Sequence, residues 1–240
     1  MSFSRTQSTS IPTSIPKDKT VKRDFPQRPL LVDYYEHYLI DQNIDVFLRA
    51  VTCRYMNSTL ERILSCGDRM ARRSAVLALG RLADYQSNRV LGGALVDSDR
   101  GVRTLAETAI RNLWMRVGTL TQRHQLSVIV ESIDEKEYEQ AARHADQLIQ
   151  DAPWIAEAWC QRGKAYFHLG SYEATLRDCQ QALEINAYHF TAASLMGQAY
   201  LLQNEPVAAL ESFRRALRLN PSMEEVRAQV IHLQRSLKGE

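Results

Sequence analysis

Long apolar runs, paired cysteines and strand signals are missing from this chain of 240 residues. No apolar stretch approaches the roughly 20 residues that a helix needs to cross a bilayer, so no membrane span is expected. The opening residues show no apolar core of a secretory signal, and we expect a cytoplasmic protein. The four cysteines form no Cys-x-x-Cys pair, which argues against a zinc or redox centre. We expect each to be a small packed hydrophobe in a reducing compartment: Cys53, Cys66, Cys160 and Cys179.

Motifs of catalysis and cofactor binding are missing as well. The segment GGAL at residues 92–95 lacks the spacing of a phosphate-binding loop, and there is no HExxH, GxSxG or kinase motif set. No two of the six histidines are three or four residues apart, so no helical metal site is expected. We therefore expect a protein without enzyme activity, cofactor, metal or small-molecule substrate.

Neither sign of charge dominates the chain, whose formal net charge is +2. Residues 1–30 hold six Lys/Arg and two Asp/Glu, residues 31–117 hold twelve and ten, and residues 118–240 hold twelve and sixteen. Nucleic-acid-binding proteins usually present a basic domain or stripe, so a nucleic-acid partner is disfavoured. Residues 1–30 are rich in Ser, Thr and Pro, and we expect a disordered basic tail because they cannot bury enough apolar surface to offset their ordering entropy.

From about residue 31 to the end, apolar residues follow the spacing of one buried helix face. The clearest stripe consists of Val102, Leu105, Ala106, Ala109, Ile110 and Leu113. No sustained alternation of β-branched residues and no hairpin dipeptide interrupts this pattern. The sequence therefore predicts an all-α fold.

The first part of this helical region repeats with an offset of 31 residues. Residues 68–82 can be laid over residues 99–113, and in both copies an Asp stands at the N-cap position of a striped helix, Asp68 and Asp99. A shorter helix fits residues 88–96 between them, and an earlier pair fits residues 44–55 and 58–66. The fragments DRMARRSAVLALGRLAD and DRGVRTLAETAIRNL resemble HEAT repeats, which assigns residues 31–117 to HEAT-like repeats. That resemblance implies that Arg72 and Arg103 tie neighbouring repeats together.

The second part follows a 34-residue register over residues 122–155, 156–189 and 190–223. The middle copy has Trp159, Gly163, Tyr166, Gly170, Tyr172 and Ala182, and the last copy has Gly197, Tyr200, Ala209, Phe213, Ala216 and Pro221. These residues resemble the tetratricopeptide repeat pattern, whereas the front helix of the first copy is degenerate. The resemblance implies an α-solenoid of antiparallel helix pairs over residues 118–240. Residues 222–237 are predicted to form a capping helix with Val226, Val230, Leu233 and Leu237 on one stripe, and residues 118–122 form either a hinge or a tight turn.

The resemblance also implies which side chains line the concave surface, since positions 2, 5, 9, 12 and 13 of each front helix face it. In this chain they are Glu157, Cys160, Lys164, Phe167, His168, Thr191, Ser194, Gln198, Leu201 and Leu202. This mixed surface is suited to an extended peptide or a helix; the alternative is a solvated inner wall, with binding on another face. The Lys and Asn clamp for chaperone tails is missing, because Leu126 and Val130 stand in its place. Arg162 replaces an apolar residue of the pattern, and its side chain either bends outward or makes a local contact.

The leading functional prediction is a non-enzymatic scaffold or adaptor that binds a protein partner in this groove. One alternative is a nucleic-acid-associated protein that uses arginines of the HEAT-like half. These arginines are Arg69, Arg72, Arg73, Arg81 and Arg103. Another alternative is the regulatory subunit of an enzyme complex. Binding that weakens steeply with salt would favour the first alternative, and any turnover by the purified protein would favour the second.

Overall fold

The computed structural model describes residues 29–238. The predicted tail at residues 1–30 therefore falls outside the described residues, apart from Pro29 and Leu30. Within residues 29–238 there are thirteen α-helices, one 3₁₀ turn and no strand. The helices are α1 (Leu30–Asp41), α2 (Ile44–Thr52), α3 (Asn57–Cys66), α4 (Arg69–Leu82), α5 (Asn88–Ala94), α6 (Arg100–Trp114), α7 (Leu120–Asp134), α8 (Tyr138–Asp151), α9 (Ala156–His168), α10 (Tyr172–Ile185), α11 (Phe190–Leu202), α12 (Pro206–Leu219) and α13 (Glu224–Lys238), with the 3₁₀ turn at Tyr85–Ser87.

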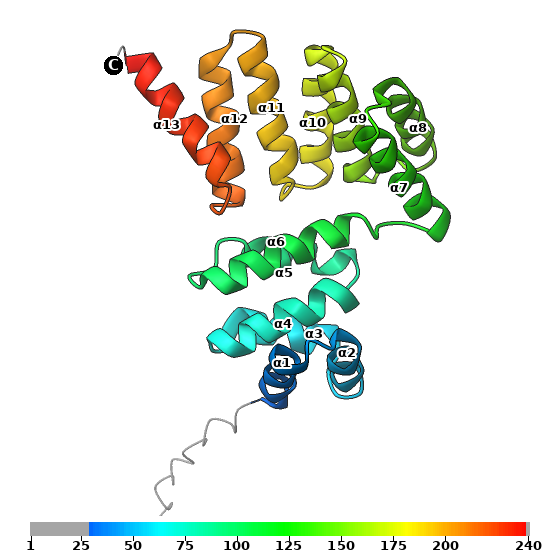
Figure 1. The fold of residues 1–240 in the computed structure, drawn as a ribbon, viewed down its shortest axis with the longest axis vertical. Coiled ribbons are helices and arrows are strands. Elements are labelled where there is room, and N and C mark those ends of the chain that lie inside the picture. Colours follow the sequence, from blue (N-terminus) through cyan, green and yellow to red (C-terminus); the bar gives the residue numbers. More distant parts are fainter. Residues whose placement is uncertain (1–28, 239–240) are drawn as a thin grey trace, which may run out of the picture.

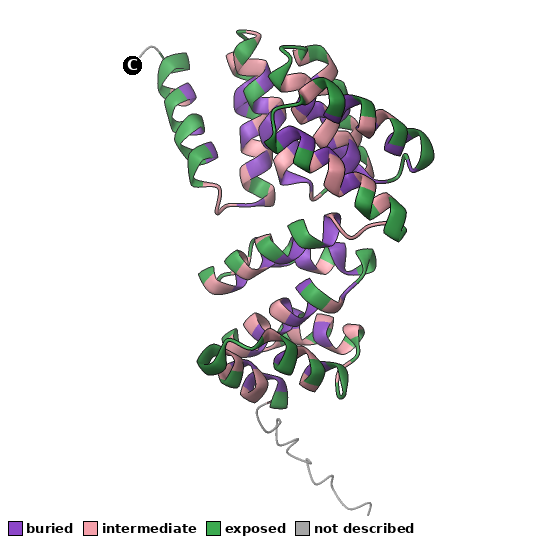
Figure 2. Ribbon diagram, turned by 45° about the vertical axis from the view of Figure 1, so that its right-hand side comes forward, coloured by how far each residue is buried: buried purple, intermediate pink, exposed green. Residues whose placement is uncertain are grey.

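Two helical halves lie one above the other along the longest axis of the molecule (Figure 1). Helices α1–α6 form the N-terminal half, and α7–α13 fan out as antiparallel neighbours in the C-terminal half. Buried residues lie on the helix faces turned toward neighbouring helices, and exposed residues cover the outer faces (Figure 2). The predicted all-α helical-repeat fold is confirmed.

In the N-terminal half, the two predicted aspartate caps begin the two longest helices. Asp68 Oδ1 accepts the backbone N–H of Ala71 at 2.8 Å, and Asp99 Oδ1 accepts that of Val102 at 3.0 Å. Each cap satisfies a donor that would otherwise lack a partner in the first turn of its helix. Both predicted N-caps are confirmed.

Paired arginines connect α4 to the loop in front of α6. Arg72 donates to both oxygens of Asp97 at 2.8 and 2.9 Å, and Arg73 donates to both oxygens of Asp99 at 2.7 and 2.9 Å. Bidentate pairs of this kind fix orientation as well as distance. Arg103 behaves differently, because its guanidinium donates to the carbonyls of Asp97 and Ser98 just ahead of its own helix. The contacts of Arg103 are therefore local, contrary to the prediction that it ties neighbouring repeats together. Arg72, for which the same role was predicted, and Arg73 connect α4 to the segment in front of α6.

Several predicted details near helix ends are wrong. The helix expected over residues 44–55 ends at Thr52, and the one expected over residues 88–96 ends at Ala94. Cys53 and Cys66 are exposed, because they stand at or beside the last residue of their helices, where the chain turns to solvent. Cys160 and Cys179 are buried, as expected.

In the C-terminal half, small residues allow paired helices to approach closely. A Cβ atom added to Gly197 on α11 would lie 2.5 Å from the ring of Phe213 on α12, well inside contact distance. Helix α13 covers the last pair with buried Val226, Val230 and Leu233. Leu237, predicted on the same stripe, is 44% exposed, and the C-terminal end of α13 leans away from α12 (Figure 1).

The link between the halves is a tight turn, one of the two predicted alternatives. Gly118 has a φ of +84°, a left-handed conformation that favours glycine. Thr119 and Gln122 then form a reciprocal capping box at the start of α7. Arg116 donates to the carbonyls of Gly80 and Ala83, which anchors the end of α6 to the end of α4.

The two halves also meet directly, through α5 and α6 on one side and the α10–α11 loop on the other. Phe190, the first residue of α11, is fully buried in the hydrophobic core of the N-terminal half. Trp114 on α6 donates to Asn88 Oδ1 at 2.8 Å, and Asn88 donates to Asn186 Oδ1 at 2.9 Å. Gly92 leaves room for the ring of Tyr188. The halves therefore share buried contacts beyond the turn that links them.

Candidate functional site

Two adjoining cavities lie along the front helices of the C-terminal half. The first, about 490 Å³, lies between α6, α9 and α11, and the second, about 690 Å³, lies between α6, α11 and α13. Five residues line both cavities: Arg111, Phe167, Ser194, Gln198 and Met223. We call the combined hollow the groove.

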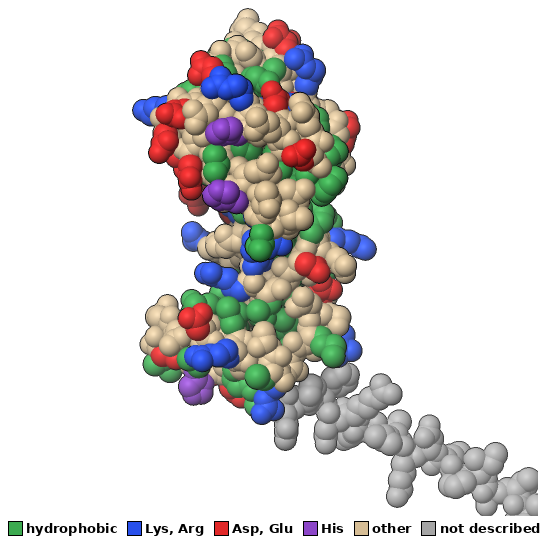
Figure 3. Space-filling model, turned by 90° about the vertical axis from the view of Figure 1, so that its right-hand side faces the viewer, with side chains coloured by type: hydrophobic (Ala, Val, Ile, Leu, Met, Phe, Trp, Pro, Cys, Tyr) green, Lys and Arg blue, Asp and Glu red, His purple; other side chains and the backbone are tan. Residues whose placement is uncertain are grey.

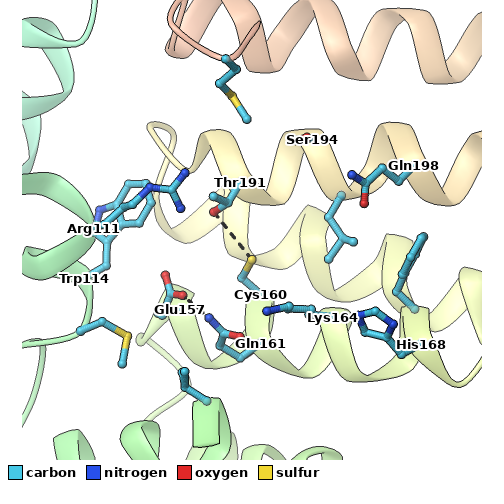
Figure 4. A pocket seen from close by; sticks show the side chains of 15 residues that line it. Arg111, Trp114, Glu157, Cys160, Gln161, Lys164, His168, Thr191, Ser194 and Gln198 are labelled. Carbon is cyan, nitrogen blue, oxygen red and sulfur yellow. Dashed lines mark hydrogen bonds between the residues drawn. The ribbon is translucent and has the colours of Figure 1, made fainter. Parts of the chain in front are cut away.

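The structure brings all ten predicted groove residues to this hollow. Eight line the first cavity: Glu157, Cys160, Lys164, Phe167, His168, Thr191, Ser194 and Gln198. The other two, Leu201 and Leu202, line the second cavity. Figure 4 shows how α9 and α11 present side chains of the first cavity, among them Lys164, Thr191 and Gln198, to the same space. Their role in binding a partner stays a prediction.

One of the ten, Glu157, forms the floor of the first cavity and already has partners. Glu157 is 8% exposed, and its two oxygens contact Gln161 Nε2 at 2.6 Å and His189 Nε2 at 3.0 Å. Burial by itself would raise the pKa of Glu157, but the hydrogen bond and charge of His189 outweigh burial and hold this pKa below its ordinary value. Burial likewise works against protonated His189, while the Glu157 carboxylate helps to raise the pKa of His189 above its ordinary value. The Glu157–His189 pair therefore belongs to the framework of the cavity.

His189 connects this floor to the N-terminal half. Its imidazole is fully buried and stacks on the Trp114 ring, with centroids 4.3 Å apart and planes 14° apart. Thr191 Oγ1 lies 2.9 Å from His189 Nδ1 on the other side of the ring. Both ring nitrogens of His189 therefore have hydrogen-bonding partners. The stacking of the imidazole on Trp114 holds the floor of the cavity against α6.

Sequence reasoning missed one whole wall of the groove. Helix α6 supplies Arg111, Trp114 and Met115 to the first cavity, although it belongs to the N-terminal half. The guanidinium of Arg111 lies over the Phe190 ring at 4.7 Å, and it pairs with Glu107 at 3.0 Å. No local pattern identifies this wall, because it forms by contacts between residues some 75 positions or more apart in the chain, such as Trp114 and His189. The remaining side chains that the prediction missed are Val130, Gln161, Leu195 and Met223.

Two cationic side chains enter the first cavity. Lys164 on α9 makes no ion pair among the described residues, and Arg111 enters from α6 (Figure 4). Burial and the positive charge of Lys164 both lower the pKa of His168, which stacks on the Tyr138 ring at 4.5 Å. The neutral form of His168 is therefore favoured at pH 7, and the positive charge of this cavity comes from Lys164 and Arg111.

The arginines of the nucleic-acid alternative are largely engaged elsewhere. Arg72 and Arg73 are paired with carboxylates, and Arg103 is bound to backbone carbonyls. On the face drawn in Figure 3, basic and acidic side chains are mixed, with hydrophobic side chains between them. Three of the five arginines of this alternative are therefore engaged within the protein, which reduces what they offer to phosphate groups, whose binding strength depends on the number of cations presented.

The described residues hold no group of three or more His, Cys, Asp or Glu side chains placed to bind a metal ion. None of the helices between residues 29 and 238 combines the length and the apolar character that a membrane span requires.

Comparison with protein families identifies repeats in the C-terminal half. Tetratricopeptide repeat models match residues 156–189 and residues 191–223. These are the second and third units of the predicted register, so the presence of tetratricopeptide repeats is confirmed. The HEAT-like assignment of residues 31–117 stays a prediction.

Curated relatives share parts of the chain. A tetratricopeptide repeat-containing protein of Rhizobium etli is 30% identical over 132 residues, which are 54% of this chain and 64% of that protein. Superkiller complex protein 3 of Homo sapiens is 36% identical over 64 residues, which are 27% of this chain and 4% of that protein. This chain therefore spans less than two thirds of the length of either relative.

Among solved structures, the first tetratricopeptide domain of Spaghetti (RPAP3), bound to an HSP90 peptide, has a TM-score of 0.48 at 20% sequence identity. The alignment covers 51% of this chain and 97% of that one. The Sgt2 tetratricopeptide domain from Aspergillus fumigatus has a TM-score of 0.48 at 19% identity, covering 50% of this chain and 81% of that one.

Proposed function

We propose that this chain is a non-enzymatic interaction scaffold that binds a peptide or a helix of a protein partner in the groove. The observation that carries the proposal is the continuity of the two cavities along α9, α11 and α13. Cavities of this size accommodate several side chains of a ligand. The lining combines aromatic and aliphatic surface with amide, hydroxyl and cationic groups. Such a mixture can bury apolar side chains of a ligand and orient its polar groups by hydrogen bonds.

The groove does not use the residues of the chaperone-tail clamp. Leu126, which stands at one clamp position, is fully buried in the hydrophobic core of the C-terminal half. Val130, at the other, offers the first cavity only an aliphatic side chain. Neither residue can donate a hydrogen bond from its side chain to a carboxylate. The groove therefore selects its ligand with other residues, chiefly those of α6, α9 and α11.

Affinity capture from native lysate, treated with nuclease, tests the proposal. The groove variant combines Lys164→Glu, His168→Ala and Gln198→Ala, three changes at side chains that line the first cavity. We expect it to retain less than about a tenth of the partner captured by the wild type, since removal of central contacts commonly costs more than about 1.4 kcal/mol of binding. Circular dichroism should show an unchanged helical content.

A matched control variant carries the same types of substitution at residues outside the groove: Arg218→Glu, His232→Ala and Gln180→Ala. All three residues are exposed and none lines either cavity. This variant should capture the partner as well as the wild type does. Equal capture by the groove variant would place binding on another face and contradict the proposal.

A further inference from the structure

The first cavity has an excess of positive charge at one end. Arg111 is half-exposed and Lys164 is partly exposed, so a ligand can reach both, whereas the Glu157 carboxylate beneath them is occupied by His189 and Gln161. Arg111 has an exposed ion pair with Glu107, which is weak in water and can be exchanged for a ligand. The excess of positive charge at this place therefore favours an anionic group.

The other end of the groove has the opposite character. Glu224 and Glu225 line the second cavity, together with the apolar side chains of Leu201 and Leu202. Acidic groups of a ligand are repelled there, while its apolar side chains can be buried. Arg111 and Glu107 of α6 line this second cavity as well, so the groove changes gradually, from cations beside α6 and α9 to apolar surface with carboxylates beside α13.

We propose that the groove binds an acidic peptide segment, whose Asp or Glu side chains bind between Arg111 and Lys164 and whose apolar side chains extend toward Leu201 and Leu202. This inference rests on the proposed function and specifies its ligand. The N-terminal half takes part in recognition because α6 supplies Arg111. The anion subsite is therefore incomplete in the repeats alone, and it differs from a clamp built only from repeat positions.

The geometry favours carboxylates of a peptide over other anions. Phe167, Leu195 and Met223 line the cavity beside the two cations, so an occupant also buries apolar surface there. The amides of Gln161 and Gln198 and the hydroxyl of Ser194 offer hydrogen bonds to a peptide backbone. Nucleic acid, which binds through many phosphates, finds only two cations in this cavity.

Fluorescence polarisation with four labelled hexapeptide pools tests this inference on the full chain. One pool alternates Asp or Glu with Leu or Phe, and the others replace the acidic residues by Asn or Gln, by Lys or Arg, or by phosphoserine. We expect the acidic pool to bind at least about tenfold more tightly than the amide pool, with an affinity that falls as salt rises. The substitutions Lys164→Glu and Arg111→Gln should each weaken binding of the acidic pool about tenfold or more, whereas the exposed control Arg218→Glu should leave that binding unchanged.

Gln198→Trp separates failure of this inference from failure of the proposed function. Gln198 is exposed and lines both cavities, so a large ring at this position obstructs the groove without altering its charge. Equal binding of the acidic and amide pools, both lost in Gln198→Trp, would overturn the acidic preference and leave groove binding intact. Preference for the phosphoserine or basic pool, again lost in that variant, would also overturn it. Binding by every pool that persists in Gln198→Trp, or binding by none, would count against both.

Discussion

Arg162 connects three helices through a single side chain. Its guanidinium donates twice to Asp178 on α10, at 2.7 and 2.8 Å, and once to Asp146 on α8, at 2.5 Å. The same group lies over the Trp159 ring at 4.9 Å. The sequence marked Arg162 as a departure from the repeat pattern but left open whether it bends outward or makes a local contact. The structure shows that it makes a local contact. The sequence could not decide this, because both carboxylates come from neighbouring helices 16 residues away in the chain, and helix periodicity carries no information about contacts at that separation.

Asp99 allows a test at the residue scale, because its pKa is held at about 2, below its ordinary value, by the hydrogen bonds and charge of Arg73. A lowered pKa in the folded state stabilises the protein above the ordinary pKa of Asp, and this stabilisation is lost as pH falls toward 2. Asp99→Asn keeps an N-cap but removes the charge. We expect it to lower the free energy of unfolding by about 1 kcal/mol at pH 7.

Urea denaturation of the wild type and Asp99→Asn between pH 2 and pH 7 measures this difference. The gap between the two proteins should be constant above about pH 5 and should narrow as pH falls from there toward 2. A gap that does not change with pH would contradict a contribution from the charge of Asp99.

At the scale of helices, local patterns predicted most of the architecture. The N-caps Asp68 and Asp99 and the stripes of α6 and α13 correspond closely to what the spacing of polar and apolar residues indicates. Wrong predictions gather at helix ends, as with Thr52, Ala94 and Leu237. Ends depend on where the neighbouring helix stops covering the surface, and apolar periodicity within one helix does not contain that information.

Two glycine substitutions test the close packing of helices. Gly197→Ala places a methyl group against the ring of buried Phe213, so we expect a loss of about 1–3 kcal/mol from overpacking. Gly93→Ala on α5 is the matched control, because nothing lies within 4 Å of an added Cβ there. It should stabilise the protein by up to about 1 kcal/mol, since alanine favours helices. Thermal and urea unfolding compare both with the wild type, and equal effects at the two sites would contradict the close approach of α11 and α12.

At the scale of the molecule, the important feature is the contact of α6 with the C-terminal half. Trp114, Phe190 and His189 bring the two cores together and complete the floor and wall of the groove. The sequence left open whether the halves move independently. Their shared buried contacts indicate that they unfold together, because separating them would expose Trp114 and Phe190 to water.

Trp114→Ala should weaken this coupling. Removing a ring that is 2% exposed should cost about 3 kcal/mol or more, and it leaves Asn88 Oδ1 without its indole donor. We expect calorimetry to show one transition for the wild type and separated transitions for the variant, with faster amide exchange at residues 186–190. Trp154→Ala is the matched control, since Trp154 is 56% exposed and should change stability by less than about 0.5 kcal/mol. A single transition and unchanged exchange in Trp114→Ala would contradict the coupling.

The sequence by itself determined the helical class, the tetratricopeptide units and the front-helix residues that meet in the groove. The helical class follows from periodicity, which is local: residues three or four positions apart stand in fixed geometric relation once the chain is helical. The units and the groove positions follow from the resemblance of the 34-residue register to tetratricopeptide repeats. Only the tertiary structure decided that α6 forms a wall of the groove, that Arg111 and Lys164 face the same cavity, and that Glu157 is paired with His189. These contacts join segments far apart in the chain, and burial and charge pairing determine them rather than any repeating pattern.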